Sequence, residues 1–358
     1  LVFRVTFNPG PSQVSDETKA DMQQLIDERV AEISHRSAEY NDISRATIEA
    51  VRTFFAVPQD YAVLYASSAT EAMQCAVMNL VKERSAHFSC GSFSELFASV
   101  SASLGREVTV SRVEWGLKND CSVTMPADAE LITVCANETS TGLMLNDEDI
   151  ASVRQHHPEA LLAVDITSIA GLKNYPISGA DVWLFSVQKC LGLPAGLGMF
   201  FLSPRAVERA ASLKKNGLST GPFSISAMME KMQKYQTIAT PNVLAIALLG
   251  RTLERWNAQG GVAPIHAQAL SRATALNEAI ARHSAFTHFV SDEANRSCSV
   301  HCFAGDASAV RSLHEKAMSE GILLGKGYGK LKENTFRIAN FPAVPRSEWD
   351  RMCDLFRS

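Results

Sequence analysis

Short apolar runs alternate with amphipathic segments over the first two thirds of the chain. Runs rich in β-branched and aromatic residues predict strands, which span residues 61–66, 86–90, 107–111, 131–136, 161–165, 182–187 and 198–202. Apolar residues at helical spacing predict helices between several of these strands, at residues 69–82, 93–104 and 147–155. Strands that alternate with helices of this length form crossover units, so we expect a largely parallel sheet with helices on both faces.

Helical patterns flank this region, and the pattern changes after about Leu244. Helices are predicted at residues 16–33, with Ser15 as N-cap, and at 45–55. The later elements are helices at residues 245–258, 264–283, 307–320 and 346–357 and strands at 286–290, 299–303 and 335–338. We therefore expect an α/β fold with a large domain at 16–245, a smaller α+β domain at 246–358, and residues 1–15 packing on the small domain.

Composition and charge narrow the class of protein. The chain has 358 residues, 46% of them hydrophobic and 20% charged, which is typical of a globular protein with two domains. Its formal net charge of −4 gives no support for binding to nucleic acid or to a membrane surface. The longest apolar stretches fall far short of the roughly 20 residues that span a bilayer, and residues 1–7 do not resemble a signal peptide.

The cysteine pattern favours reduced thiols. Eight cysteines are scattered without CxxC pairs, which in a chain of this size indicates mostly buried thiols in a cytoplasmic protein. Cys298, His301 and Cys302 form the one cluster with metal-ligand chemistry. Alternation along a buried strand explains that cluster better, because no further ligand group is evident. We expect no bound metal.

Polar residues follow five of the predicted strands, at residues 67–70, 91–94, 137–139, 165–168 and 186–189. Ligands of open parallel sheets bind beyond the carboxyl ends of the strands. We therefore expect these five groups to meet at one edge of the sheet and to form a single active site.

Two residues of these groups have complementary chemistry. Asp165 ends the apolar run 161–165 and, taken alone, is better explained as a turn or helix cap. Lys189 follows the apolar run 182–187; burial there would lower the pKa of its amine, although a lysine can also extend from a sheet edge into water. Together they match the needs of pyridoxal 5′-phosphate, which requires a lysine for a Schiff base and a partner at its pyridine nitrogen.

Two further features fit such a cofactor. Residues 67–70 open a helix whose free N–H groups and dipole can bind a phosphate, and Thr70 is also an N-cap candidate. Phe93 could lie flat on a pyridine ring, although an aromatic residue at such a position more often belongs to the core.

The order of these motifs resembles that of phosphoserine aminotransferases, within the class V aminotransferases of fold type I. The resemblance covers nearly the whole chain and rests on residues 7–11, 33–37, 61–65 with the Ser/Thr turn that follows, 78–80, 91–94, 137–139, 165–168, 188–189, 240–241 and 337. The loop at residues 67–71 differs from the family's glycine-rich version and is closer to that of other class V members. It implies a large domain with a seven-stranded sheet and a cytoplasmic homodimer. The implied reaction, part of serine biosynthesis, converts phosphoserine and 2-oxoglutarate into 3-phosphohydroxypyruvate and glutamate.

The resemblance also implies roles around the cofactor. Lys189 would bind pyridoxal 5′-phosphate as a Schiff base and act as the catalytic base, and Asp165 would pair with the pyridine nitrogen. Phe93 would stack on the ring, and Thr139 would lie near its 3-hydroxyl group. The implied phosphate ligands are Ala69, Thr70 and Gln188, with Ala239 and Thr240 from a partner subunit.

The implied substrate residues depart from the family pattern. Arg337 would bind the substrate α-carboxylate, and His35 and Arg36 would receive the distal acidic group, although a helix-terminal structural role also explains these two. The family's Gly-His-Arg is replaced here by Gly-Lys-Leu, so that Lys330 keeps one cation while Leu331 cannot bind phosphate.

Two alternatives remain. The first is a class V enzyme that acts on an unphosphorylated amino acid such as alanine or serine, or a lyase-type relative. The second is a binding protein that keeps the fold without catalysis, which the presence of both Lys189 and Asp165 disfavours.

Overall fold

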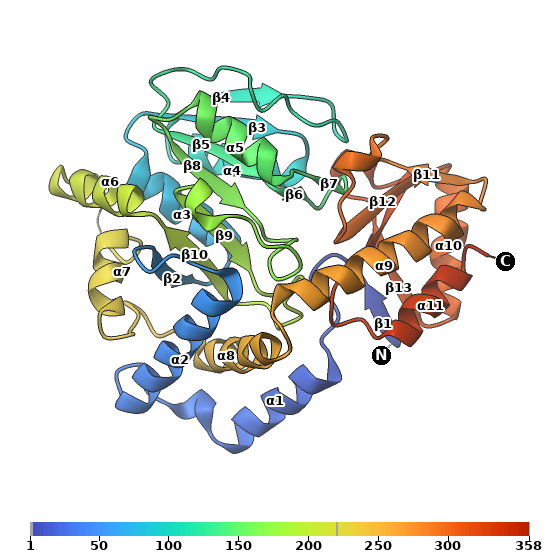
Figure 1. Cartoon of the computed structure of the whole chain (residues 1–358), viewed down its shortest axis with the longest axis horizontal. Coiled ribbons are helices and arrows are strands. Elements are labelled where there is room, and N and C mark those ends of the chain that lie inside the picture. Colours follow the sequence, from blue (N-terminus) through green and yellow to red (C-terminus); the bar gives the residue numbers. More distant parts are fainter. Residues whose placement is uncertain (1–2, 220, 358) are drawn as a thin grey trace.

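A computed structural model describes residues 3–219 and 221–357, and within them the larger sheet contains the seven predicted strands (Figure 1). They are β2 Ala62–Ala66, β3 Arg84–Ser89, β4 Glu107–Arg112, β5 Leu131–Cys135, β8 Leu161–Asp165, β9 Val182–Ser186 and β10 Gly198–Leu202. Their order is β2-β10-β9-β8-β5-β3-β4, and β10 runs antiparallel to both of its neighbours while the other pairs are parallel. The predicted, mainly parallel sheet is confirmed.

Helices cover both faces of this sheet, which explains why its central strands read as continuous apolar runs. On β9, Trp183 and Phe185 pack in the core cluster that includes α2 (Ala38–Phe55), α5 (Asp147–His156) and α8 (Val243–Ala258). Val182 and Leu184 of the same strand pack on the opposite face with α3 (Ala69–Leu80), α4 (Ser92–Ser103) and α6 (Pro204–Lys215). Neither α6 nor α7 (Ile225–Met232) was predicted. In α6 the buried positions are mainly alanines, which give a weak apolar stripe.

The smaller sheet has five strands in the described part of the chain, in the order β1-β13-β14-β12-β11. They are β1 Val5–Phe7, β11 Phe286–His288, β12 Val300–Gly305, β13 Ile322–Lys326 and β14 Thr335–Ala339. Around it lie α9 (Val262–Ala281), α10 (Ala307–Ser319) and α11 (Arg346–Asp354), at the right in Figure 1. The smaller α+β unit is confirmed. Its strands β1 and β13 were not predicted, and the domain boundaries at residues 15 and 245 remain predictions.

The helices before the large sheet differ from their predicted bounds. Ser15 caps α1 (Asp16–Asp27) by accepting a hydrogen bond from Thr18 N at 3.1 Å, as predicted. The helix predicted at 16–33 is wrong beyond Asp27, because Arg29 adopts a left-handed conformation (φ 61°) before the short 3₁₀ helix Val30–Glu32. The next helix, α2, begins earlier than predicted, since Ser37 accepts a hydrogen bond from Tyr40 N and caps it.

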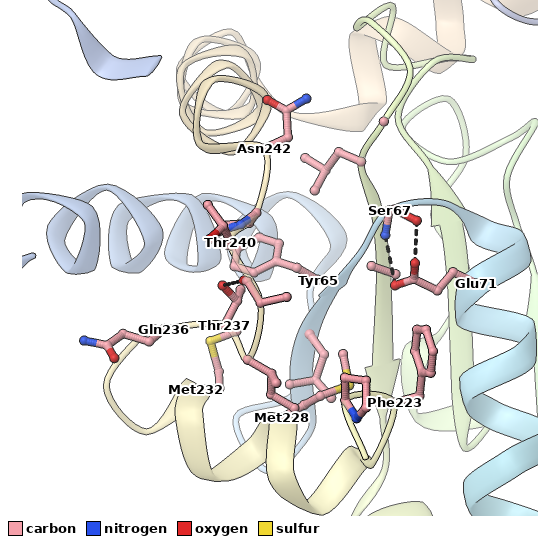
Figure 2. A pocket seen from close by; sticks show the side chains of 18 residues that line it. Tyr65, Ser67, Glu71, Phe223, Met228, Met232, Gln236, Thr237, Thr240 and Asn242 are labelled. Carbon is pink, nitrogen blue, oxygen red and sulfur yellow. Dashed lines mark hydrogen bonds between the residues drawn. The ribbon is translucent and has the colours of Figure 1, made fainter. Parts of the chain in front are cut away.

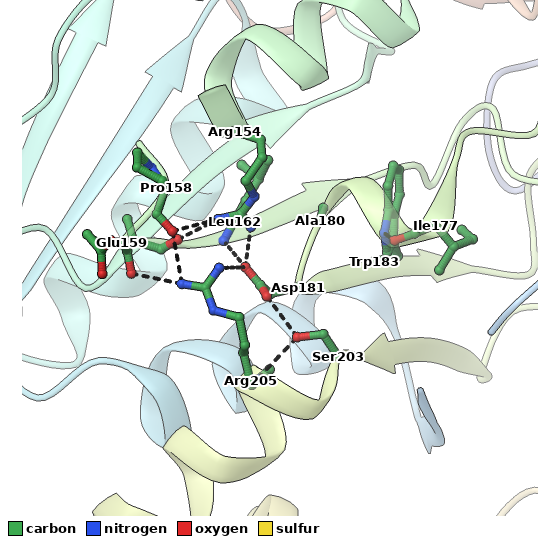
Figure 3. Close-up of polar contacts among 12 residues, drawn as sticks. Arg154, Pro158, Glu159, Leu162, Ile177, Ala180, Asp181, Trp183, Ser203 and Arg205 are labelled. Atoms are coloured by element: carbon green, nitrogen blue, oxygen red, sulfur yellow. Dashed lines mark hydrogen bonds and ion pairs between the residues drawn. The ribbon is translucent and has the colours of Figure 1, made fainter. Parts of the chain in front are cut away.

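A buried carboxylate ties together the amino edge of the large sheet (Figure 3). Asp181, directly before β9, accepts hydrogen bonds from Leu162 N at 2.9 Å and from Ser203 Oγ at 2.8 Å, and it pairs with Arg154. These contacts join β8, β9 and the start of α6. Asp181 therefore stabilises the amino edge of the sheet, which lies opposite the predicted site.

The described residues contain no helix with the length and apolar character that crossing a membrane requires. Across those same ranges, no group of three or more His, Cys, Asp or Glu side chains is arranged to hold a metal ion. The eight cysteines are free and buried, so the predicted burial of the thiols is confirmed.

Candidate active site

The five polar groups that follow the strands meet at the carboxyl edge of the large sheet, as the sequence predicts. Four contacts join them: Ala69 N to Ser186 Oγ (2.6 Å), Asn137 Nδ2 to Ser168 Oγ (2.7 Å), Lys189 Nζ to Thr139 Oγ1 (3.4 Å), and Lys189 Nζ to the centroid of the Phe93 ring (4.8 Å). The parallel strands place all five groups at the same edge, because their carboxyl ends point the same way.

The side chain of Lys189 is largely removed from water, with an exposed fraction of 9%. Burial, together with the nearby charge of Arg337, lowers the pKa of its amine to about 8. The charge of Asp165 acts in the opposite direction but more weakly. A larger fraction of the amine is therefore neutral and nucleophilic near neutral pH than for a solvated lysine.

The N-terminal segment holds the backbone of Gln188 and Lys189 through hydrogen bonds from Ser12. Ser12 Oγ donates to Lys189 O at 2.8 Å, and Ser12 N donates to Gln188 O at 3.1 Å. Gly10 has φ +139°, a conformation that favours glycine, and a Cβ there would lie 3.0 Å from Lys189 Cε and press on that side chain. The sequence drew attention to residues 7–11 only through the family resemblance, and Ser12 carried no signal.

Asp165 combines the two interpretations that the sequence left open. Its Oδ1 atom accepts hydrogen bonds from Thr167 N at 2.8 Å and Thr167 Oγ1 at 2.5 Å, which is the turn-capping role. In the described chain its Oδ2 atom has no hydrogen-bond partner. Burial raises the pKa of this carboxyl group, and the Thr167 bonds and the Lys189 charge act against that rise. One oxygen of a buried carboxylate thus remains for a ligand.

Arg337, on β14 of the smaller sheet, extends to Thr139 beside Lys189. Its Nη1 atom donates to Thr139 O at 3.0 Å, and its Nε atom donates to Lys326 O at 2.8 Å. Over the residues the structure describes, Nη2 has no hydrogen-bond partner. The guanidinium lies 5.3 Å from the ring of Tyr328, which in turn lies 5.2 Å from the Phe93 ring. Backbone carbonyls therefore orient the guanidinium while one of its terminal nitrogens remains for an anion.

The first turn of α3 offers fewer free donors than the sequence suggested. Ala69 N already donates to Ser186 Oγ, and Glu71 N donates to Ser68 Oγ at 3.1 Å. Within residues 3–219 and 221–357, Thr70 N and Oγ1 have no partner, and neither does the side-chain amide of Gln188. Thr70 is therefore the residue of this turn with both donors open to an anion.

His35, Arg36, Ala239 and Thr240 lie elsewhere. Arg36 donates to Thr237 O at 2.7 Å and to Ile238 O at 2.9 Å. The loop continues into Ala239 and Thr240, which are exposed and line a cavity of about 390 Å³ beside the end of β2 (Figure 2). In the described chain, no hydrogen bond, ion pair or ring contact joins these four residues to Lys189 or Asp165. The structure does not bring them to the Lys189 site within one chain.

Lys330 is exposed and packs on the ring of Trp115. Its Nζ atom lies 4.6 Å from the centroid of the Trp115 ring, and Trp115 Nε1 donates to Glu95 Oε1 at 3.1 Å. Glu95 lies in the first turn of α4, two residues after Phe93, and Tyr328, two residues before Lys330, contacts the Phe93 ring. Lys330 therefore lies beside the Phe93 side of the site. Trp115 follows β4, and no sequence pattern pointed to it.

Comparisons with known proteins show the family and the fold of the chain. A family model described as aminotransferase class-V matches residues 5–329. The chain is 30% identical to phosphoserine aminotransferase of Rhodococcus opacus over 94% of this chain and 90% of that protein, and 30% identical to that of Corynebacterium glutamicum over 97% and 92%. The solved structure of a phosphoserine aminotransferase from Cytophaga hutchinsonii superposes with a TM-score of 0.94 at 32% identity, covering 99% of this chain and 98% of that one. An aspartate aminotransferase from Thermus thermophilus, at 21% identity and a TM-score of 0.85, shares the fold.

The lowered pKa of Lys189 gives a first prediction. Competitive acetylation of the protein, freed of bound aldehydes with hydroxylamine, should label Lys189 increasingly as pH rises, with an inflection at about 8. Lys118, whose pairing with Asp149 raises its pKa above the ordinary value, provides the control within the same digest. A Lys189 inflection at or above the ordinary lysine value of roughly 10.4 would show that the amine is not desolvated.

Proposed function

We propose that this chain, which belongs to the class V aminotransferases, transfers the amino group of phosphoserine to 2-oxoglutarate with pyridoxal 5′-phosphate as cofactor. The products are 3-phosphohydroxypyruvate and glutamate. One observation carries the proposal: a buried amine with a pKa of about 8 lies at the same sheet edge as a buried carboxylate that keeps one unpaired oxygen.

The residues at this edge fit the cofactor. Its aldehyde needs a neutral amine, which Lys189 supplies, and its pyridine nitrogen needs an acidic partner, for which Asp165 Oδ2 is available. The Phe93 ring lies 4.8 Å from Lys189 Nζ and can cover one face of a planar ring, with the Thr139 hydroxyl beside it. Thr70 offers an open N–H and a hydroxyl group to the phosphate. Ala69 and Gln188 flank that position.

The proposed mechanism assigns each of these side chains a task. Bound here, the cofactor would supply a ring that accepts the electron pair left when a proton leaves the substrate Cα atom. The buried carboxylate of Asp165 would hold a proton on the ring nitrogen. Arg337 Nη2 binds the substrate carboxylate and so turns the Cα–H bond toward Lys189. The Lys189 amine, with its pKa of about 8, would take that proton and then give it to the cofactor carbon that carries the aldehyde in the free cofactor.

A second copy of the chain would complete the site. A cofactor phosphate carries up to two negative charges, and within one chain Thr70 alone in its turn offers two open donors. Ala239 and Thr240 are exposed and directly follow Thr237 and Ile238, whose carbonyls accept hydrogen bonds from Arg36, so they are suited to reach a neighbouring subunit. The assembly would then be a two-fold homodimer with composite sites. Eight free thiols agree with a cytoplasmic setting.

The distal end of the substrate pocket is where phosphoserine and a neutral amino acid differ. Lys330 on the Trp115 ring, with His35 and Arg36 of the second copy, would provide cations for a phosphate. Leu331, half-buried beside Lys330, offers none, and this favours the alternative of an unphosphorylated donor such as alanine or serine. Phosphoserine remains our choice because the curated relatives at 30% identity bear that name.

A donor screen tests this choice. Single-turnover rates of the cofactor-loaded protein should be highest with phosphoserine and glutamate and lower with alanine and serine. Lys330→Met should raise the KM for phosphoserine about tenfold, the effect of losing one charge-assisted hydrogen bond, and should leave alanine unaffected. Lys332→Met, a neighbouring exposed lysine, is the matched control and should change neither. Preference of the unaltered protein for alanine or serine would favour the alternative.

Complementation tests the composite site. Lys189→Ala and Thr240→Asp homodimers should each be inactive, the second because a carboxylate would repel the phosphate. After the two are dissociated and reassociated together, about a quarter of wild-type activity should return, because half of the dimers are mixed and each has one intact site. Lys189→Ala mixed with Arg337→Ala should recover nothing, since those residues share a chain. An active monomer in sedimentation would remove Ala239 and Thr240 from the site.

A further inference from the structure

Glu138 is a fully buried carboxylate beside the Lys189 site, with an exposed fraction of 0%. It forms no ion pair within the described residues. Its oxygens instead accept hydrogen bonds from Ser94 N at 2.9 Å, Ser94 Oγ at 3.0 Å, Phe93 N at 3.1 Å, Ser140 N at 3.2 Å and Ser140 Oγ at 2.6 Å. Burying a charge is costly unless it is paired, and here the free N–H groups and dipole of the α4 N-terminus compensate.

The backbone at Gly91 packs closely against the Glu138 side chain. A Cβ atom on Gly91 would lie 2.3 Å from Glu138 Cγ and 2.6 Å from Ser140 Oγ. Gly91 therefore has to be glycine for the carboxylate to reach the helix. Ser94 Oγ in turn accepts from Gly91 N at 3.1 Å, so the start of α4 closes around the carboxylate.

The residues that Glu138 holds are those that contact Lys189. Phe93, whose N–H it accepts, places its ring 4.8 Å from Lys189 Nζ. Thr139, the next residue along the chain, accepts from Lys189 Nζ through its hydroxyl and from Arg337 Nη1 through its carbonyl. The carboxylate thus binds the backbone of Phe93 directly, and it is linked to the Thr139 hydroxyl and the Arg337 guanidinium through the chain at Thr139.

We propose that Glu138 is a positioning residue for the transamination: it fixes Phe93 and Thr139 as one unit around Lys189, and it fills the α4 N-terminus with a protein carboxylate. Because that N-terminus is neutralised, an anionic cofactor group is directed to the open first turn of α3 at Thr70. The proposal rests on the proposed function, since it concerns how the same site holds its cofactor. With its oxygens occupied by donors of Phe93, Ser94 and Ser140, Glu138 would itself touch neither cofactor nor substrate.

A carboxylate that only stabilised the fold would behave differently, and Asp181 supplies the comparison. Asp181 is also buried and accepts bonds from a backbone N–H and a serine hydroxyl, but it lies at the amino edge of the sheet (Figure 3). Asp181→Asn and Glu138→Gln each remove one buried charge and turn an acceptor into a donor. Both should lower the melting temperature.

The readouts are pyridoxal 5′-phosphate affinity, measured by equilibrium dialysis, and the near-visible circular dichroism of the bound cofactor. Glu138→Gln should raise the dissociation constant about tenfold, as expected when a charge-assisted hydrogen bond to the Phe93 turn is lost, and should weaken the dichroism. Asp181→Asn should leave both unchanged. Glu138→Asp, which keeps the charge, should recover part of the dichroism. Ser140→Ala removes one hydrogen-bond donor to Glu138 without changing the charge. It should raise the dissociation constant and weaken the dichroism, but by less than Glu138→Gln does.

The outcomes separate the two proposals. If Glu138→Gln binds the cofactor with unchanged affinity and dichroism, or if Asp181→Asn changes them equally, Glu138 is not a positioning residue and the proposed function stands. If Glu138→Gln does not fold, the test passes to Ser140→Ala. The positioning role is then overturned if Ser140→Ala leaves both the cofactor affinity and the dichroism unchanged. If the unaltered protein binds no pyridoxal 5′-phosphate, the proposed function fails, and the role of Glu138 fails with it.

Discussion

The removal of the Lys189 amine from water is the constraint on which the rest of the site depends. A lysine at the end of a buried strand is costly to keep charged, and the structure lowers its pKa to about 8 instead of pairing it with a carboxylate. Phe93 and Gly10 close around the side chain, and Ser12 binds its carbonyl. The nucleophilic state of the amine thus follows from packing, and any loosening of that packing would return it toward an ordinary lysine.

Two sheets share this packing. The larger sheet provides Lys189 and Asp165 at its carboxyl edge, whereas Arg337 comes from β14 of the smaller sheet. The N-terminal segment links them, because β1 pairs with β13 of the smaller sheet and the chain then passes over Lys189 to Ser12. A substrate held by Arg337 would therefore lie between the two units, and a shift of one against the other would change the distance between the bound carboxylate and the amine.

The sequence predicted the large sheet well, since helices bury both faces of its strands and the apolar runs are unmistakable. It missed β1, which has three residues, and α6, whose buried face is mostly alanine. Lys189 and Asp165 could be found because a polar residue at or just after the end of an apolar run is a local signal. Glu138 lies in the group 137–139 that this signal marks, but the sequence assigned it no role, and Ser12 and Trp115 carried no local signal. The importance of these three residues comes from contacts with residues distant in the chain.

The most direct test of the account is the identity of the amine that binds pyridoxal 5′-phosphate. Addition of the cofactor to the purified protein should give a near-visible absorption band, and borohydride should abolish it while fixing the label to the protein. Mass spectrometry of the digested protein should then find the label on Lys189, and Lys189→Ala should give neither band nor label. A label on Lys173 or Lys214, or an unchanged band in Lys189→Ala, would contradict the account.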